Sequence, residues 1–189
     1  MRIVAGEARG RRLRSADLAG LRPSLDRVRE ALFSILGDVS GASVLDLFAG
    51  TGALGIEALS RGAGRTVFVE GDPQALELVR ANLASSGLAA RASVRHATLP
   101  RGLESLVRDE QPFDLVLADP PYEGTARDQT LTDPYFDRLL APQGLLVVEH
   151  DAHHPPAERL GALERVDQRR YGSTRLSFYR RPAASGELP

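Results

Sequence analysis

The residues best suited to chemistry are four consecutive ones, Asp119, Pro120, Pro121 and Tyr122. Two adjacent prolines form sheet and helix poorly, so this segment is expected to be a rigid loop. The Asp119 carboxylate and the Pro120 carbonyl can accept hydrogen bonds from an amine, and Tyr122 can stack on a planar base. Such acceptors stabilise the positive charge that develops on the exocyclic amine of a nucleobase when it attacks a methyl group. The pattern therefore favours methyl transfer to this kind of amine over a purely structural turn.

A second candidate site is a glycine-rich segment, in which Gly50, Gly52 and Gly55 have the spacing G-x-G-x-x-G. This spacing is typical of a loop that cradles a dinucleotide pyrophosphate. Asp46, however, lies four residues before the first glycine. A carboxylate there would repel phosphates and attract the ammonium and sulfonium groups of S-adenosylmethionine. The charge pattern thus favours S-adenosylmethionine over NAD, with a tight structural turn as the remaining alternative.

These two segments must be positioned by the elements around them. The residue patterns predict strands at 43–48, 66–70, 92–96, 113–118 and 144–150, and helices at 26–36, 53–62, 73–86 and 100–110. Alternating strands and helices imply an α/β fold with a doubly wound, mostly parallel sheet. Segments 163–172 and 174–181 are typical of an antiparallel hairpin at one edge of the sheet. Both candidate sites then lie at the carboxyl ends of strands, where open α/β sheets bind their ligands.

The N-terminal segment is basic: residues 1–30 contain eight arginines and four acids, a balance of +4 in a chain whose net charge is −1. Residues 1–22 are interpreted as a hairpin or arm that contacts RNA phosphates. The arginines expected to bind RNA are Arg2, Arg9, Arg11, Arg12, Arg14, Arg22 and Arg27. A solvated arm is the alternative, and the arginines near 22–29 could instead pair with Asp26 and Glu30.

The amino-acid composition excludes several kinds of functional site. The 189-residue chain has no cysteine, which excludes disulfides, thiolate zinc sites and a cysteine nucleophile. Residues 23–181 are expected to form one catalytic domain and 182–189 a flexible tail. No signal peptide or long apolar run is evident, so we expect a soluble cytoplasmic protein, acting as a monomer. His150, His153 and His154 beside Asp151 are interpreted as a solvated loop, and no metal site is expected.

Taken together, the segments "RIVAGEARGRRL", "RPSLDRVREALFSIL", "VLDLFAGTGALGIEALSRGA", "FDLVLADPPY" and "YGSTRLSFY" resemble the RsmD-type bacterial 16S rRNA guanine-N2 methyltransferases. The resemblance extends from residue 1 to about residue 180. It implies a seven-stranded, Rossmann-like class I methyltransferase fold and S-adenosylmethionine as methyl donor. It also implies a guanine of 16S rRNA as target, on an assembled or nearly assembled small ribosomal subunit.

The resemblance also implies roles for individual residues. Asp119 to Tyr122 would hold the guanine amine, and Glu70 would accept the ribose hydroxyls, although an acid before Gly71 could also be a surface turn residue. The residues expected to contact the cofactor are Asp46, Phe48, Ala49, Gly50, Thr51, Gly52, Glu70, Gly71, Thr98 and Leu99. One departure is Thr98, which stands where similar enzymes often place an acid or amide against the adenine.

Four other interpretations remain open at this point. An N6-adenine DNA or RNA methyltransferase shares the D-P-P-Y motif, but recognition of a DNA duplex usually needs an added domain for which this chain leaves no room. An enzyme acting on a protein side-chain amide tends to have asparagine in place of Asp119. A NAD-dependent oxidoreductase gives the D-P-P-Y motif no role, and a non-catalytic RNA-binding module needs no cofactor pocket.

Overall fold

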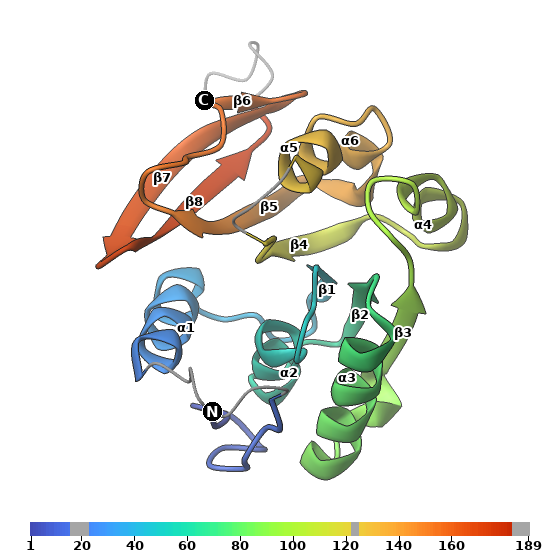
Figure 1. The fold of residues 1–189 in the computed structure, drawn as a ribbon, viewed down its shortest axis with the longest axis vertical. Helices are drawn as coiled ribbons and strands as arrows, with labels where there is room; N and C mark the ends of the chain where they lie inside the picture. Colours follow the sequence, from blue (N-terminus) through green and yellow to red (C-terminus); the bar gives the residue numbers. More distant parts are fainter. Residues whose placement is uncertain (16–22, 122–124, 183–189) are drawn as a thin grey trace, which may run out of the picture.

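The protein is built on one eight-stranded sheet with the strand order β3-β2-β1-β4-β5-β8-β7-β6 (Figure 1). The computed structural model describes residues 1–15, 23–121 and 125–182. The strands are β1 (Ser43–Leu47), β2 (Arg65–Glu70), β3 (Ala92–His96), β4 (Phe113–Ala118), β5 (Leu140–Asp151), β6 (Arg159–Leu160), β7 (Leu163–Tyr171) and β8 (Thr174–Arg180). Strands β1 to β5 pair in parallel, and β5, β8, β7 and β6 pair antiparallel. The mostly parallel α/β sheet with an antiparallel edge is therefore confirmed.

The sheet has one strand more than the seven expected. The additional strand, β6, has only two residues and pairs with the start of β7 at the edge of the sheet. Two residues are too few to give an alternating pattern, so the sequence carried no signal for it. Strand β5 also begins four residues earlier than expected, at Leu140. The sequence did not predict this first part because Pro142 and Gly144 separate it from the apolar run that marks the later part of the strand.

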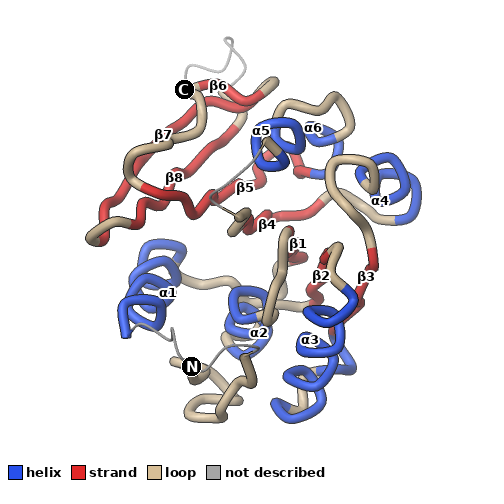
Figure 2. Tube along the Cα trace, in the orientation of Figure 1, coloured by secondary structure: helices blue, strands red, loops and turns tan. Residues whose placement is uncertain are grey.

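Helices cover both faces of the sheet (Figures 1 and 2). The helices are α1 (Pro23–Leu36), α2 (Ala53–Ser60), α3 (Pro73–Ser86), α4 (Leu103–Asp109), α5 (Ala126–Leu131) and α6 (Phe136–Leu139), with a short 3-10 turn at Ala89–Arg91. Helices α1 to α3 lie on one face, and α4 to α6 lie on the other. As expected, Asp72 caps α3 by accepting a hydrogen bond from Gln74 N at 2.8 Å.

The alternation of side chains along each strand produces two separate cores, one on each face. In β1, for example, Val44 packs with α1 and α2, whereas Leu45 and Leu47 pack with α4 and α6. All three side chains are completely buried. A strand that is apolar on both faces is typical of a parallel sheet covered by helices on each side.

The N-terminal segment is a hairpin that packs against the domain. Arg2 and Arg12 form an antiparallel bridge, and Ile3, Ala8 and Leu13 are buried in the same core as α1 and α2. Three buried apolar side chains among the arginines thus fix one side of the hairpin to the protein.

Helix α2 holds the hairpin through its backbone. The fully buried Glu57 carboxylate accepts hydrogen bonds from Val4 N at 2.8 Å and Ala5 N at 3.0 Å, and Ser60 Oγ accepts one from Ala8 N at 3.0 Å. At Gly6, with φ of +83°, a Cβ atom would lie 1.7 Å from Ser60 O. Only glycine permits this close approach.

A second anchor connects the hairpin to the glycine-rich segment. The completely buried Asn82, on α3, accepts a hydrogen bond from Arg14 N at 2.7 Å and donates to Arg14 O at 3.0 Å. Its amide also donates to Thr51 O at 2.9 Å. The Asn82 side chain therefore forms hydrogen bonds with backbone groups of both the hairpin segment and the glycine-rich segment.

Candidate functional site

The candidate site lies at the carboxyl ends of β1 and β4, beside the last part of β5. Leu47 of β1 pairs with Ala118 of β4, and Ala118 pairs with Val148 of β5. The next residues are Phe48 and Asp119, which follow β1 and β4, and Glu149, which is still within β5. Parallel pairing in register therefore brings these three residues to one edge of the sheet.

The glycine-rich segment turns sharply after β1. Phe48 has a φ of +57° and is the one described non-glycine residue with a positive φ, while Gly50 and Gly52 have φ values of +54° and +76°. A left-handed conformation at a bulky residue such as Phe48 is energetically unfavourable, and strained residues of this kind cluster at active and ligand-binding sites. The turn brings the backbone of residues 48–52 to the edge of the sheet and starts α2 directly behind it.

Asp46 is buried beneath this turn, with 2% of its surface exposed. Its Oδ2 accepts a hydrogen bond from Gly55 N at 2.9 Å. A Cβ atom on Gly55 would lie 2.4 Å from the Phe68 ring and 2.9 Å from that carboxylate. The third glycine of the motif thus allows α2 to pack closely against β2 and lets its backbone reach Asp46.

Glu70, at the end of β2, holds the neighbouring turns. Its Oε2 accepts a hydrogen bond from Gly50 N at 2.8 Å, and its Oε1 accepts from Gly71 N at 2.7 Å and Asp72 N at 2.9 Å. A carboxylate offers about four acceptor positions, so about one is left, on Oε2. Glu70 can therefore accept about one further hydrogen bond while these three persist, and a second only if one of them is exchanged.

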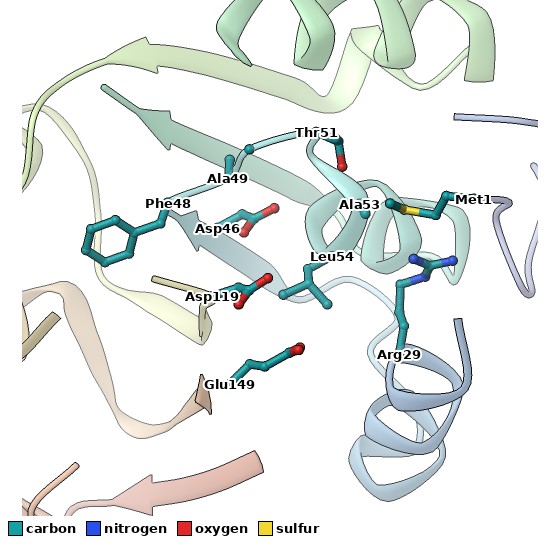
Figure 3. Close-up of a pocket in the computed structure, with 11 residues that line it drawn as sticks. Met1, Arg29, Asp46, Phe48, Ala49, Thr51, Ala53, Leu54, Asp119 and Glu149 are labelled. Carbon is teal, nitrogen blue, oxygen red and sulfur yellow. The ribbon is translucent and has the colours of Figure 1, made fainter. Parts of the chain in front are cut away.

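A cavity of about 290 Å³ opens over Asp46 and the glycine-rich segment (Figure 3). Its lining residues are Met1, Arg29, Asp46, Phe48, Ala49, Gly50, Thr51, Ala53, Leu54, Asp119 and Glu149. Asp46, Asp119 and Glu149 extend in the same direction, and the Arg29 guanidinium from α1 faces the cavity from another side (Figure 3). We call this space the carboxylate cavity.

A second cavity, of about 400 Å³, lies on the other side of Phe48 and Asp119, which line both spaces. Its other lining residues include Glu70, Gly71, Thr98, Leu99 and Pro121. All ten residues expected to contact the cofactor except Gly52 therefore line one of the two cavities. Gly52 instead packs behind the turn, where its Cβ position faces Ile56, Val79 and Phe68.

The electrostatics of the carboxylate cavity are dominated by its three acids. Burial raises the pKa of Asp46 well above its usual range, and the nearby Asp119 and Glu70 charges add to the effect. The pKa of Asp119 rises to about 6 because the surrounding protein desolvates the carboxyl, even though its side chain is exposed at the cavity mouth. Burial and the charge of Asp119 raise the pKa of Glu149 to about 8, against a smaller opposing effect of Arg29. A cation placed among these carboxyls would favour their ionised forms.

The D-P-P-Y motif begins immediately after β4, as expected. Pro120 is buried, and Pro121 is exposed and faces the second cavity. Tyr122 lies outside the described residues. The structure thus brings Asp119 to both cavities and Pro121 to the second one.

The arginines expected to bind RNA are exposed wherever the structure describes them. These residues are Arg2, Arg9, Arg11, Arg12, Arg14 and Arg27, and Arg22 lies outside the described residues. Within the described part of the chain, none of the six forms an ion pair with an acid. Five of them come from the hairpin, which presents its charge to solvent and its apolar side chains to the protein.

Sequence reasoning missed five residues that line the carboxylate cavity, of which Glu149 and Arg29 are charged and Met1, Ala53 and Leu54 are apolar. Glu149 lies inside the predicted strand at 144–150, and no motif such as D-P-P-Y marks it. Arg29 is not a surface residue of α1; it is 3% exposed, pairs with Asp26 at 2.9 Å and approaches Glu57 at 3.4 Å. Its position on the apolar side of α1 was the signal that could have placed it in the interior.

One minor expectation was wrong. His153 and His154 are exposed as expected, but His150 is only 1% exposed and lies within β5. Its Nε2 lies 2.9 Å from Ser177 Oγ on β8, and its Nδ1 lies 2.8 Å from the Asp151 carbonyl. The strand continues to Asp151 because β8 pairs with it that far.

The order of the strands, the two helical layers and the site at the strand ends define the class: the fold is that of the Rossmann-like methyltransferases. The chain belongs to the family described as Conserved hypothetical protein 95, whose model matches residues 1–180. This membership confirms the family resemblance seen in the sequence motifs.

Three relatives illustrate the similarity. The Bacillus subtilis protein YlbH, provisionally named an rRNA methyltransferase, is 35% identical over 184 residues, which cover 96% of this chain and 99% of YlbH. Ribosomal RNA small subunit methyltransferase D of Escherichia coli K12 is 36% identical over 155 residues, covering 82% of this chain and 76% of that protein. The solved structure of Escherichia coli YhhF, provisionally named a methyltransferase, superposes with a TM-score of 0.81 and 33% identity, covering 97% of this chain and 99% of that one.

Two other kinds of feature are absent from the described residues. No helix in residues 1–15, 23–121 or 125–182 has both the length and the apolar character needed to cross a membrane. Over the same ranges, no group of three or more histidine, aspartate or glutamate side chains is arranged to hold a metal ion.

Proposed function

We propose that this protein transfers a methyl group from S-adenosylmethionine to the exocyclic N2 amine of a guanine in 16S rRNA, on the assembled small ribosomal subunit. The observation that carries the proposal is the position of Asp119, which follows β4 and lines both cavities. The names of the relatives support rRNA of the small subunit as the substrate. The proposal also includes action as a monomer in the cytoplasm, where ribosomal subunits assemble.

The residues around the two cavities fit S-adenosylmethionine. Asp46 is buried, and among the described residues its carboxylate accepts only the Gly55 hydrogen bond, so one oxygen is left for a cationic ligand. Asp46, Phe48 and the backbone of residues 49–51 would hold the methionine part. Glu70, Thr98 and Leu99 would hold the adenosine part in the second cavity, with Thr98 in place of an acid or amide.

When bound, S-adenosylmethionine supplies a methyl group on a sulfonium: the N2–carbon bond forms, the carbon–sulfur bond breaks, and sulfur keeps the electron pair. Asp119 and the Pro120 carbonyl orient the amine by accepting its hydrogens, which stabilises the positive charge that develops on nitrogen. With a pKa of about 6, the Asp119 carboxyl is ionised at neutral pH and can accept the proton that N2 loses. Tyr122 would stack on the base and the hairpin arginines would bind rRNA phosphates.

The direct test uses purified protein, labelled S-adenosylmethionine and small subunits that lack the modification. After digestion to nucleosides, the label is expected in N2-methylguanosine. Label in N6-methyladenosine would replace the proposal by the adenine alternative, and absence of label from the rRNA would refute both.

A matched pair of variants tests the assigned role of Asp119. We expect Asp119→Ala to abolish turnover and retain S-adenosylmethionine binding in calorimetry. Asp109→Ala, at an exposed aspartate of α4 that pairs with Arg108, should retain both. Normal turnover by Asp119→Ala would remove this residue from the mechanism.

A further inference from the structure

The carboxylate cavity contains a side chain that the proposed mechanism does not use. Glu149 is 6% exposed and lines the cavity next to Asp119. Among the described residues, no hydrogen bond or ion pair involves its carboxylate, whose oxygens are not enclosed by the protein and open into the cavity. The carboxylate faces the cavity, in the same direction as Asp119 and Asp46 (Figure 3).

The sheet fixes the relation between Glu149 and Asp119. Because Ala118 and Val148 are partners in the parallel pair of β4 and β5, Asp119, the first residue after β4, lies beside Glu149, which is still within β5. Adjacent strands lie about 4.8 Å apart, which places two acceptors side by side at the cavity edge. Burial and the charge of Asp119 raise the pKa of Glu149 to about 8, consistent with the closeness of the two groups. The carboxyl of Glu149 therefore keeps its proton at neutral pH in the free protein, and a cationic cofactor in the same cavity favours the ionised form that accepts hydrogen bonds.

Two adjacent acceptors match one nucleobase edge. Guanine presents two neighbouring donors, the N2 amine and N1–H, whereas adenine and cytosine present one amine beside a bare ring nitrogen that is itself an acceptor. A carboxylate facing such a nitrogen would leave two acceptors opposed and unpaired, which is costly in a buried site. With the amine held at Asp119, the donor next to it faces Glu149.

We infer that Glu149 determines specificity for guanine by accepting a hydrogen bond from N1–H of the base whose N2 amine is held at Asp119. This inference rests on the proposed function and adds the group that distinguishes guanine from other amine-bearing bases. The N1–H proton stays on the base during the transfer. The hydrogen bond to a carboxylate also increases electron density in the ring and so makes the amine a better nucleophile.

The test compares two substrates on reconstituted small subunits. One carries guanine at the position that the unaltered enzyme methylates, and the other carries 2-aminopurine, which retains the 2-amine but has a bare N1. We expect unaltered enzyme to prefer guanine in kcat/KM. In Glu149→Gln the preference should fall about 10- to 100-fold, the effect of losing a hydrogen bond to a charged group, because the amide can donate to the bare N1.

Two matched variants separate this role from others. Asp119→Asn should lower kcat/KM for both substrates alike, since both retain the amine. Glu158→Gln, at an exposed residue paired with Arg165, should leave both rates and their ratio unchanged. S-adenosylmethionine binding by Glu149→Gln verifies that the variant folds, and Glu149→Asp, which draws the carboxylate back, replaces it if it does not.

The possible outcomes test the role of Glu149 separately from the proposed function. If the unaltered enzyme forms N2-methylguanosine and the guanine preference is the same within about twofold in the Glu149 variant, the inference is overturned and the proposed function stands. If the unaltered enzyme forms no N2-methylguanosine on small subunits, the inference and the proposed function are both refuted. A collapsed preference with intact cofactor binding supports the assignment.

Discussion

The buried carboxylate of Glu57 is predicted to hold the N-terminal hairpin on the domain, and Glu57→Gln tests this. The carboxylate accepts hydrogen bonds from Val4 N and Ala5 N and forms an ion pair with Arg61 Nε at 2.8 Å. Arg29, itself 3% exposed, approaches it at 3.4 Å. Glutamine keeps the volume, so the change removes charge and one acceptor oxygen without opening a cavity.

The expected decrease in the free energy of unfolding of Glu57→Gln follows from these contacts. A hydrogen bond to a charged group contributes about 1.5–3 kcal/mol, and removing one partner of a buried ion pair costs about 3–5 kcal/mol. Since the amide oxygen retains one acceptor, we expect a decrease of roughly 3 kcal/mol in the free energy of unfolding. For a domain of this size that corresponds to a fall in Tm of roughly 10 °C.

The assay is urea unfolding followed by circular dichroism, with Glu77→Gln as control. Glu77 also pairs with an arginine on a helix, Arg80 at 2.6 Å, but its side chain is 74% exposed. Exposed pairs of this kind contribute about 0.3–0.5 kcal/mol. If Glu57→Gln is destabilised no more than Glu77→Gln, the carboxylate does not anchor the hairpin and the reasoning fails.

Three further outcomes are expected. Gly55→Ala should destabilise the protein by about 1–3 kcal/mol in urea unfolding, since the new Cβ meets the Phe68 ring at 2.4 Å. The double variant Arg9→Ala/Arg12→Ala should reduce the slope of log affinity against log salt for rRNA by roughly 0.7–0.9 for each phosphate that is no longer neutralised, measured by filter binding; an unchanged slope would remove these arginines from the RNA interface. Because the pKa of Glu149 is raised from 4.5 to about 8, its folded form keeps a proton that the unfolded chain releases, so stability should fall as pH rises through this window. Glu149→Gln should flatten that dependence in unfolding midpoints measured across it.

Much of the sheet could be predicted because its signals are local. Buried parallel strands such as β4 form uninterrupted apolar runs, and Asp72 followed by Pro73 marks the start of α3 by capping chemistry that needs no tertiary contact. The D-P-P motif is likewise local, since prolines stop a strand wherever it lies. The sequence therefore places Asp119 at the correct strand end.

The features that could not be predicted from the sequence depend on contacts between residues that are distant along the chain. Glu149 resembles any other acid within a strand until the register of β4 and β5 sets it beside Asp119. Ile3, Ala8 and Leu13 have neither helical nor strand spacing, and their burial depends on α2. The short helices α5 and α6, with six and four residues, contain too few turns for periodicity to be recognised.

The way in which the hairpin is anchored has a consequence for how its surface can change. Glu57, Ser60 and Asn82 bind it through the amide nitrogens of Val4, Ala5, Ala8 and Arg14, which every residue except proline possesses. These bonds do not depend on which side chains point outward. Most of the arginines can therefore be exchanged, by mutation or by design, to suit a different polyanion while the scaffold beneath them stays as it is.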